Sequence, residues 1–269
     1  MIRFYAEPIV RAQDLISQLN LATQDQNLKP NQLFGDDVKR YISDRLDQLT
    51  RQLLGVELKM THKAAERMKE KLAQTAAVSA FRYDIREIQS RLFDEIGAAY
   101  LLALSPAEKE RYEPAKSVFG VRVETKFASA SFEIDEASKC MGLGRYTAAV
   151  FHLMRTTEIG LGAVRACLGI PSPDKTADRS WGAILKTIKE VMDERNKRLS
   201  IKPWNLPGDK EFFDGAYASL DAVKNAWRNT TMHVEIKYTE EEADRVFRAV
   251  HGFMDRLSER MDEQGQPRA

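Results

Sequence analysis

The sequence predicts an all-α protein, in which an N-terminal helical region precedes a second bundle of about five helices. Apolar residues recur every three or four positions along most of the 269-residue chain, which is the spacing of one helical face. Charged residues make up 30% of the chain, while glycine and proline contribute only 14 and 9 residues. This composition favours helices over β-sandwiches or barrels.

The first part of the chain shows this periodicity in successive segments. We predict helices over residues 9–21, 36–54, 56–77 and 81–104. The polar stretch after the first of them contains Pro30 and is predicted to be a loop, with Asp36 as the N-cap of the next helix. Ser105 and Glu108 have the spacing of a capping box around Pro106, which predicts another helix start.

A domain boundary is expected after these helices. Residues 113–123 contain Pro114, Gly120 and a β-prone run of valines and phenylalanine. We therefore predict a division near residue 118, which gives an N-terminal helical region, a second bundle and a flexible tail at 1–118, 119–262 and 263–269.

The second part has the clearer pattern. Five amphipathic segments with short connections predict a bundle, with helices over residues 127–141, 145–168, 181–198, 210–228 and 240–261. Ser180 is the expected N-cap of the third, and Thr239 with Glu242 forms a capping box before the last.

Composition excludes several classes of protein. The chain has 41 Lys plus Arg against 40 Asp plus Glu, so it lacks the basic excess of a protein that binds nucleic acid through bulk charge. Its two cysteines, Cys140 and Cys167, are too few for a disulfide framework or a cysteine-based zinc site and are expected to be buried. No metal and no cofactor are expected. Without a signal peptide or an apolar run of about 18 residues, we expect a cytoplasmic protein with no membrane partner.

Among the four histidines, His233 has the most distinctive surroundings. His62 is expected at the surface, and His152 and His251 are expected in the core or half-buried within helices. His233 instead follows the predicted helix that ends near Arg228. On a straight helix these two residues would point about 140° apart, so they converge only if the helix ends or distorts there, or if two copies of the protein meet.

The run Arg228-Asn229, three residues, then His233 resembles the Arg-Asn-x-x-x-His form of the HEPN motif. Residues 139–158 are similar to the long early helix of that domain, and the motif lies between the last two long helices, as in the family. The resemblance covers about residues 119–262. It implies a HEPN-like helical bundle and a metal-independent endoribonuclease that uses the RNA 2′-hydroxyl as its nucleophile.

The resemblance also implies roles for individual residues. His233 would transfer a proton and Arg228 would bind phosphate, which suits their chemistry, while Asn229 would orient one of the two. Glu158 and Arg155 are expected to support them from the early helix. Because one histidine is too few for two proton transfers, we expect a homodimer with a composite active site. Arg145 and Arg165 are expected to bind RNA if they face the same groove.

The family further implies a role in toxin–antitoxin systems, anti-phage defence or stress response, with an antitoxin or other regulatory protein as partner. One residue departs from the pattern of the toxins whose tyrosine is modified, because Glu235 occupies the place of that tyrosine. Two alternatives stay open. One is a non-catalytic HEPN-like module that binds RNA, a nucleotide or a protein partner. The other is an all-helical scaffold without small-molecule chemistry.

Overall fold

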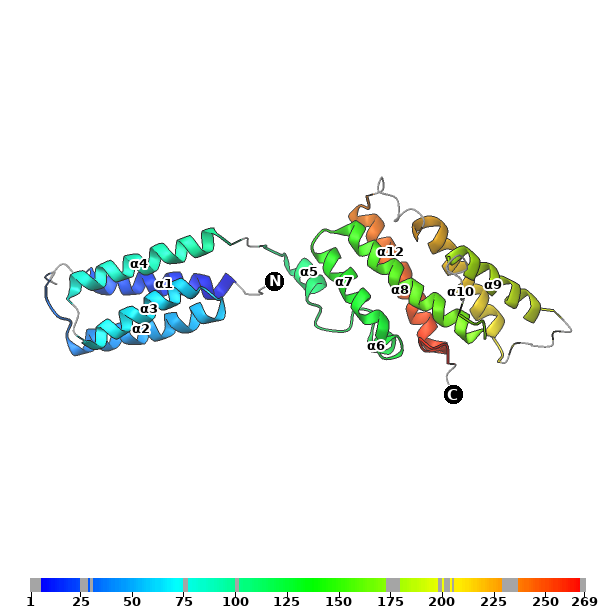
Figure 1. Ribbon diagram of the computed structural model, residues 1–269, viewed down its shortest axis with the longest axis horizontal. Coiled ribbons are helices and arrows are strands. Elements are labelled where there is room, and N and C mark those ends of the chain that lie inside the picture. Colours follow the sequence, from blue (N-terminus) through cyan, green and yellow to red (C-terminus); the bar gives the residue numbers. More distant parts are fainter. Residues whose placement is uncertain are drawn as a thin grey trace. The chain divides into compact units, whose positions relative to one another are not determined.

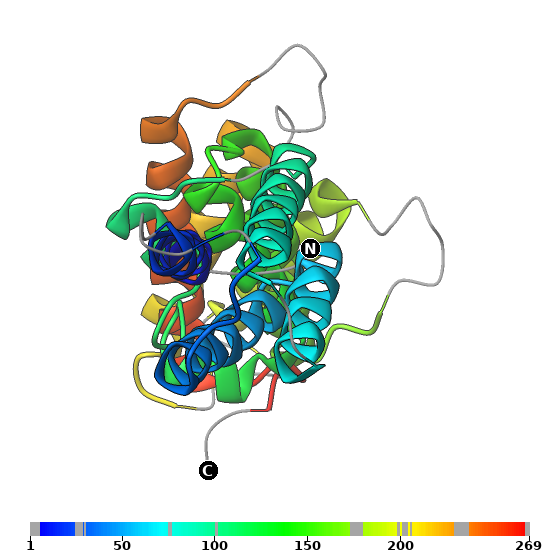
Figure 2. The same cartoon turned by 90° about the vertical axis from the view of Figure 1, so that its left-hand side faces the viewer.

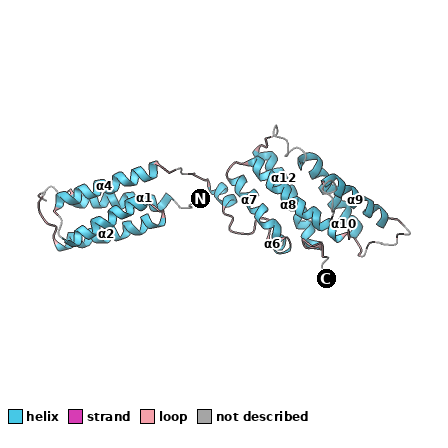
Figure 3. Ribbon diagram, in the orientation of Figure 1, coloured by secondary structure: helices cyan, strands magenta, loops and turns pink. Residues whose placement is uncertain are grey.

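The computed structural model is all-α, as predicted (Figures 1 and 3). It describes residues 6–24, 29, 31–74, 77–99, 102–172, 180–197, 200, 204, 206–228 and 237–266. In this part of the chain the regular elements are helices, with isolated β-bridge positions and no strand. None of the described helices is long and apolar enough to cross a membrane.

The chain divides into two compact units, Met1–Leu102 and Ala103–Ala269, and each has its own hydrophobic core. The predicted division near residue 118 therefore falls inside the second unit. The second unit begins before residue 118 because α5 (Pro106–Tyr112) packs against α7 (Ser131–Gly142) and so belongs to it. Gly142 permits this packing, because a Cβ there would lie 2.7 Å from the carbonyl oxygen of Glu108.

The first unit is a bundle of four helices, α1 (Ala6–Thr23), α2 (Asp36–Gly55), α3 (Lys59–Gln74) and α4 (Val78–Gly97). Each helix packs against two others, in the cyclic order α1, α2, α3, α4. Figure 2 looks roughly along the bundle and shows the helices around a shared centre. Their apolar stripes meet there and leave the side chains of Leu46, Leu49, Phe81 and Ile85 almost without solvent exposure.

Three details of the first unit differ from the prediction, the first being that α3 begins at Lys59 and not at residue 56. The N-cap of α2 is Gly35 rather than Asp36, which is the first helical residue. The last helix ends at Gly97 and not near residue 104. Residues 102–105 are not helical, because Ser105 takes the extended conformation required of an N-cap before Pro106.

The second unit contains the five predicted long helices. They are α7, α8 (Tyr146–Cys167), α9 (Trp181–Arg195), α10 (Asp209–Val223) and α12 (Glu240–Arg260). The centre of the unit is α8, which packs against α7, α10 and α12. The predicted caps are confirmed: Ser180 accepts from the N–H of Ala183, and Ser105 and Thr239 each form a full capping box.

Three segments of the second unit adopt structures that local sequence did not predict. The β-prone run enters a short helix, α6 (Val121–Lys126), because Phe119 and Val123 are buried in the core. A 3₁₀ turn, η1 (Ala128–Ala130), precedes α7. After α10 the chain forms a π-helical turn, η3 (Lys224–Arg228).

The described part of the predicted flexible tail is packed against the bundle. The backbone N–H of Glu263 donates to the carbonyl oxygen of Lys126 at 2.9 Å, and its carboxylate accepts from the N–H of Ser129 at 2.9 Å. Gly265 has a φ of +74° and lies against the C-terminal turn of α8, where a Cβ would meet the carbonyl oxygen of Ala163 at 2.7 Å. The expectation of a flexible tail is therefore wrong for residues 263–266.

Candidate functional site

The predicted motif begins at the end of the π-helical turn. Arg228 is the last residue of η3. Its side chain, together with Asn229 and His233, lies outside the described residues. An i→i+5 turn replaces the regular helix immediately before the motif. Turns of this kind are frequent at functional sites.

The two ends of the motif segment are tied to each other and to α8. The hydroxyl group of Tyr238 donates to the carbonyl oxygen of Trp227 at 3.3 Å, and the N–H of Tyr238 donates to Oγ1 of Thr147 at 3.1 Å. We call Thr147, Trp227 and Tyr238 the clasp. It brings the chain before Arg228 and the chain after His233 to the N-terminal turn of α8.

A second contact supports this arrangement. The hydroxyl group of Tyr146 donates to Oε2 of Glu240 at 3.1 Å, which joins the first turns of α8 and α12. Burial and the neighbouring Glu240 carboxylate both raise the pKa of Tyr146 above its ordinary value, so the hydroxyl keeps its proton at neutral pH. The chain on either side of the motif segment is therefore held by hydrogen bonds between side chains and backbone.

The two predicted RNA-binding arginines lie at opposite ends of α8. Arg145 precedes its first turn, next to Tyr146 and Thr147, and is exposed. Arg165 lies twenty residues further along, which is about 30 Å at 1.5 Å per residue. There its Nη1 donates to the carbonyl oxygen of Ile170 at 2.8 Å and holds the turn that follows the helix. Only Arg145 lies at the clasp, so the two arginines do not share one groove.

Arg155 and Glu158 have separate partners. Nε of Arg155 donates to Oε1 of Glu133 on α7 at 2.7 Å, whereas Oε1 of Glu158 accepts from Nε1 of Trp181 on α9 at 3.3 Å. These contacts join α8 to two different helices and include none of the residues of the clasp. The expected supporting role of both residues stays a prediction, because the side chains of Arg228, Asn229 and His233 lie outside the described residues.

Sequence reasoning did not anticipate the partner of His152. The Nδ1 atom of this half-buried histidine lies 2.8 Å from Oε2 of Glu133, so one carboxylate bridges His152 and Arg155. The sequence does contain a signal for this pair, because Glu133 interrupts the apolar face of α7 beside Ile134 and Ala137. His251, predicted to be half-buried, is exposed and stacks on Phe119.

The Glu133 side chain is only 8% exposed but is ionised. Burial by itself raises its pKa. The hydrogen bonds from His152 and Arg155, together with the charge of Arg155, lower it by more, so the pKa of Glu133 lies below its ordinary value. Because an ionised carboxylate only accepts hydrogen bonds, Nδ1 of His152 carries a proton.

The remaining chemical features of the described residues do not form a site. No group of three or more His, Cys, Asp or Glu side chains within the described ranges is arranged to hold a metal ion. The two cysteines are half-buried at the edge of the core rather than fully buried, and burial raises the pKa of both thiols.

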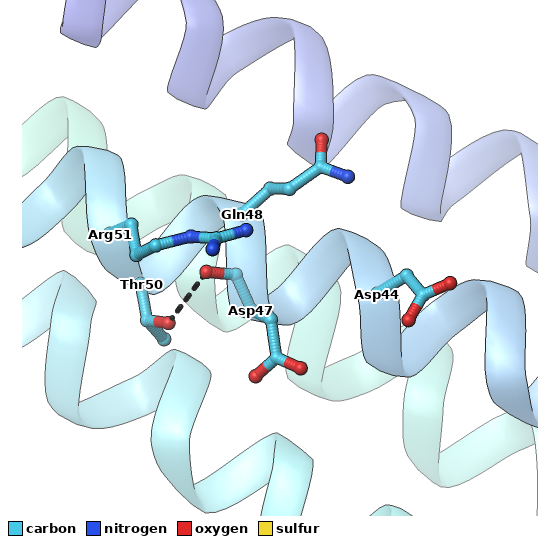
Figure 4. Close-up of a pocket in the computed structure, with 5 residues that line it drawn as sticks. All are labelled: Asp44, Asp47, Gln48, Thr50 and Arg51. Atoms are coloured by element: carbon cyan, nitrogen blue, oxygen red, sulfur yellow. Dashed lines mark hydrogen bonds between the residues drawn. The ribbon is translucent and has the colours of Figure 1, made fainter.

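One surface hollow of about 360 Å³ lies in the first unit (Figure 4). Its lining residues are Asp44, Asp47, Gln48, Thr50 and Arg51. All of them belong to α2, and Asp47 is already paired with Lys69. A hollow with a single helix as its wall has no opposing groups that converge on a ligand.

Comparisons with protein-family models, curated proteins and solved structures gave no match to this chain.

Proposed function

We propose that this chain is a metal-independent endoribonuclease of the HEPN type, with Arg228, Asn229 and His233 at its active site. The observation that supports this most is the clasp, together with the π-helical turn that precedes it. A short polar motif catalyses a reaction only if its backbone is held in position. The bonds from Tyr238 to Trp227 and Thr147 hold both ends of the segment that carries this motif.

The proposed reaction is an internal transfer at phosphorus. The RNA 2′-oxygen loses its proton to a base and forms a bond to the adjacent phosphorus, while the bond from phosphorus to the 5′-oxygen breaks and that oxygen takes up a proton. The products are a 2′,3′-cyclic phosphate and a 5′-hydroxyl. Histidine suits either proton transfer, and the planar guanidinium group of Arg228 suits the phosphate oxygens.

A homodimer is part of the proposal. His233 supplies one proton-transfer group, whereas the reaction needs an acceptor and a donor, and a second copy of the motif would supply the other. Sedimentation should show a dimer at the concentrations at which the chain cleaves RNA. A strict monomer with full activity would contradict the composite site.

Arg145 is an exposed cation two residues before Thr147 of the clasp. We propose that it attracts the RNA backbone there. A role in toxin–antitoxin systems, anti-phage defence or stress response, under control of a partner protein, extends the same proposal.

The test is cleavage of a labelled single-stranded RNA in EDTA. We expect wild-type protein to produce cyclic phosphate ends and His233→Ala to lose about 10²- to 10⁴-fold in rate, which is the usual contribution of a general acid or base. His62→Ala, a histidine in the first unit, serves as the matched control and should keep full activity. A folded, dimeric wild type that binds several RNAs without cleaving them would favour the non-catalytic binding module instead.

A further inference from the structure

A second group of polar side chains lies on α7 and α8, separate from the motif. Glu133 bridges Nδ1 of His152 and Nε of Arg155 with its two carboxylate oxygens, at 2.8 and 2.7 Å. His152 and Arg155 are three positions apart on α8 and therefore neighbours on its surface. We call these three residues the Glu133 cluster.

The cluster leaves two hydrogen-bonding groups unused. Nδ1 of His152 is occupied by Glu133, which leaves Nε2 as the ring nitrogen open to a ligand. Arg155 uses only Nε, and its side chain is 55% exposed. Among the described residues, neither Nε2 of His152 nor the two terminal nitrogens of Arg155 have a hydrogen-bond partner.

An aromatic surface adjoins these groups. The ring of Phe151 is 41% exposed and lies edge-on to the His152 ring, with 6.1 Å between centroids. Phe151 is also four positions before Arg155, so the two side chains share one face of α8. An exposed phenylalanine next to an arginine is a common stacking surface for a base of single-stranded nucleic acid.

We propose that the Glu133 cluster and Phe151 bind one nucleotide unit of single-stranded RNA. The guanidinium group of Arg155 binds the phosphate, Nε2 of His152 accepts a hydrogen bond from the ribose 2′-hydroxyl, and Phe151 stacks on the base. Glu133 positions His152 and Arg155 and does not touch the ligand. The choice of RNA as ligand rests on the proposed ribonuclease function.

The location suits a strand that continues from the motif. Phe151 follows Thr147 of the clasp by four residues, so the two lie on one face of α8, with a rise of about 6 Å between them. The 2′-hydroxyl contact gives the cluster a preference for RNA over DNA, since this group is the one that DNA lacks.

The test measures binding of a fluorescently labelled short oligouridine and of its deoxyribose counterpart to the full chain carrying His233→Ala, which prevents cleavage during the measurement. We expect Phe151→Ala to weaken binding of both by about fivefold or more, because stacking on an aromatic side chain accounts for that much per base. Arg155→Ala should also weaken both.

Arg67 in the first unit is the matched control for Arg155. It is similarly exposed, at 57% against 55%, and it also pairs with a glutamate, Glu87, at 3.7 Å. Arg67→Ala should leave both affinities unchanged. Equal losses for Arg67→Ala and Arg155→Ala would mean a general charge effect and would overturn the site.

His152→Asn is the decisive variant. The asparagine amide still donates to Glu133 but has no counterpart of Nε2, so RNA affinity should fall about three- to tenfold while DNA affinity stays constant. An unchanged ratio of RNA to DNA affinity would overturn the sugar contact. Thermal unfolding of each variant checks the fold, and Phe151→Ala stays informative because it leaves Glu133 and its partners intact.

The same data separate this inference from the ribonuclease proposal. A wild type that cleaves RNA while Phe151→Ala and Arg155→Ala bind normally would overturn the cluster site alone. A wild type that does not cleave, with losses of binding at Phe151, Arg155 and His152, would overturn the ribonuclease and keep the binding site.

Discussion

Tyr238 donates its hydroxyl hydrogen to the carbonyl oxygen of Trp227 at 3.3 Å, although the two residues are 11 positions apart. The hydrogen bond joins the last turn before Arg228 to the residue that precedes the N-cap of α12. This bond closes the base of the segment that contains His233. It connects the fold to the proposed chemistry more directly than any other described contact.

We predict that Tyr238→Phe reduces RNA cleavage more than it reduces stability. Removal of the hydroxyl group costs one hydrogen bond, about 1 kcal/mol of unfolding free energy. It also frees one end of the motif segment, which we expect to lower the cleavage rate about tenfold or more. Cleavage rates and urea unfolding measure the two effects. Tyr83→Phe, at an exposed tyrosine of the first unit, should change neither.

We predict that Glu95 stabilises the first unit and that this stabilisation is lost in acid. Its carboxylate accepts from the N–H groups of Met60 and Thr61 and from the Thr61 hydroxyl, so it caps the first turn of α3 from α4. Burial raises the pKa of Glu95, but these three hydrogen bonds and the charge of Arg91 lower it by more. The folded state thus favours the ionised carboxylate.

The direction of the pH effect follows from this lowered pKa. The stabilisation by Glu95 is complete above the unfolded pKa, near 4.5, and is lost as the pH falls through the lower folded value. We expect Glu95→Gln to cost about 1 kcal/mol at pH 7, as for other capping residues, and nothing in strong acid. Urea unfolding between pH 7 and 2 measures it. The exposed Glu70→Gln on α3 should show no such pH-dependent difference; an equal one would contradict the capping role.

We predict that the contact between α8 and α12 does not tolerate a larger residue at Gly160. A Cβ at this position would lie 2.7 Å from Cε1 of Phe253 and 3.0 Å from Cδ1 of Leu257. Gly160→Ala should therefore destabilise the second unit by about 1–3 kcal/mol through overpacking. Gly162→Ala on the same helix meets nothing within 4 Å and should stabilise by about 0.5–1 kcal/mol. Thermal unfolding distinguishes the two, and equal shifts would exclude tight packing as the cause.

Gly265 tests whether the C-terminal segment is part of the fold. Both Gly265 and Gly169 have positive φ, at +74° and +72°, so alanine is strained at either position. Only at Gly265 would a Cβ also collide with α8, whereas Gly169 has open space around it. Gly265→Ala should lower the melting temperature by more than Gly169→Ala. Equal effects would mean that the segment detaches readily from α8.

The helices and caps could be predicted from the sequence because they depend on local interactions. Periodic apolar residues located the helices, because each helix must bury one face. The caps at Ser105, Ser180 and Thr239 were readable because a capping bond joins residues only three positions apart. The boundary between the units was misplaced because α5 is assigned by its packing on α7, which no local signal reveals.

The candidate site was predictable only in part. The sequence placed the motif near the end of a helix, and η3 ends at Arg228, but the π-helical turn itself had no local signal. It left open whether Arg145 and Arg165 face one groove, and the structure places them at opposite ends of α8. It also missed the bond between His152 and Glu133, which are 19 positions apart.

The sequence by itself determined the helical class, the five long helices of the second unit and the position of the Arg-Asn-x-x-x-His run. Those features depend on residues within one or two turns of each other. Only the tertiary structure decided that Tyr238 closes the motif segment, that Glu133 joins His152 to Arg155 and that residues 263–266 pack on α8. These contacts arise when helices distant in sequence pack together to bury their apolar faces, and that packing selects which polar groups meet.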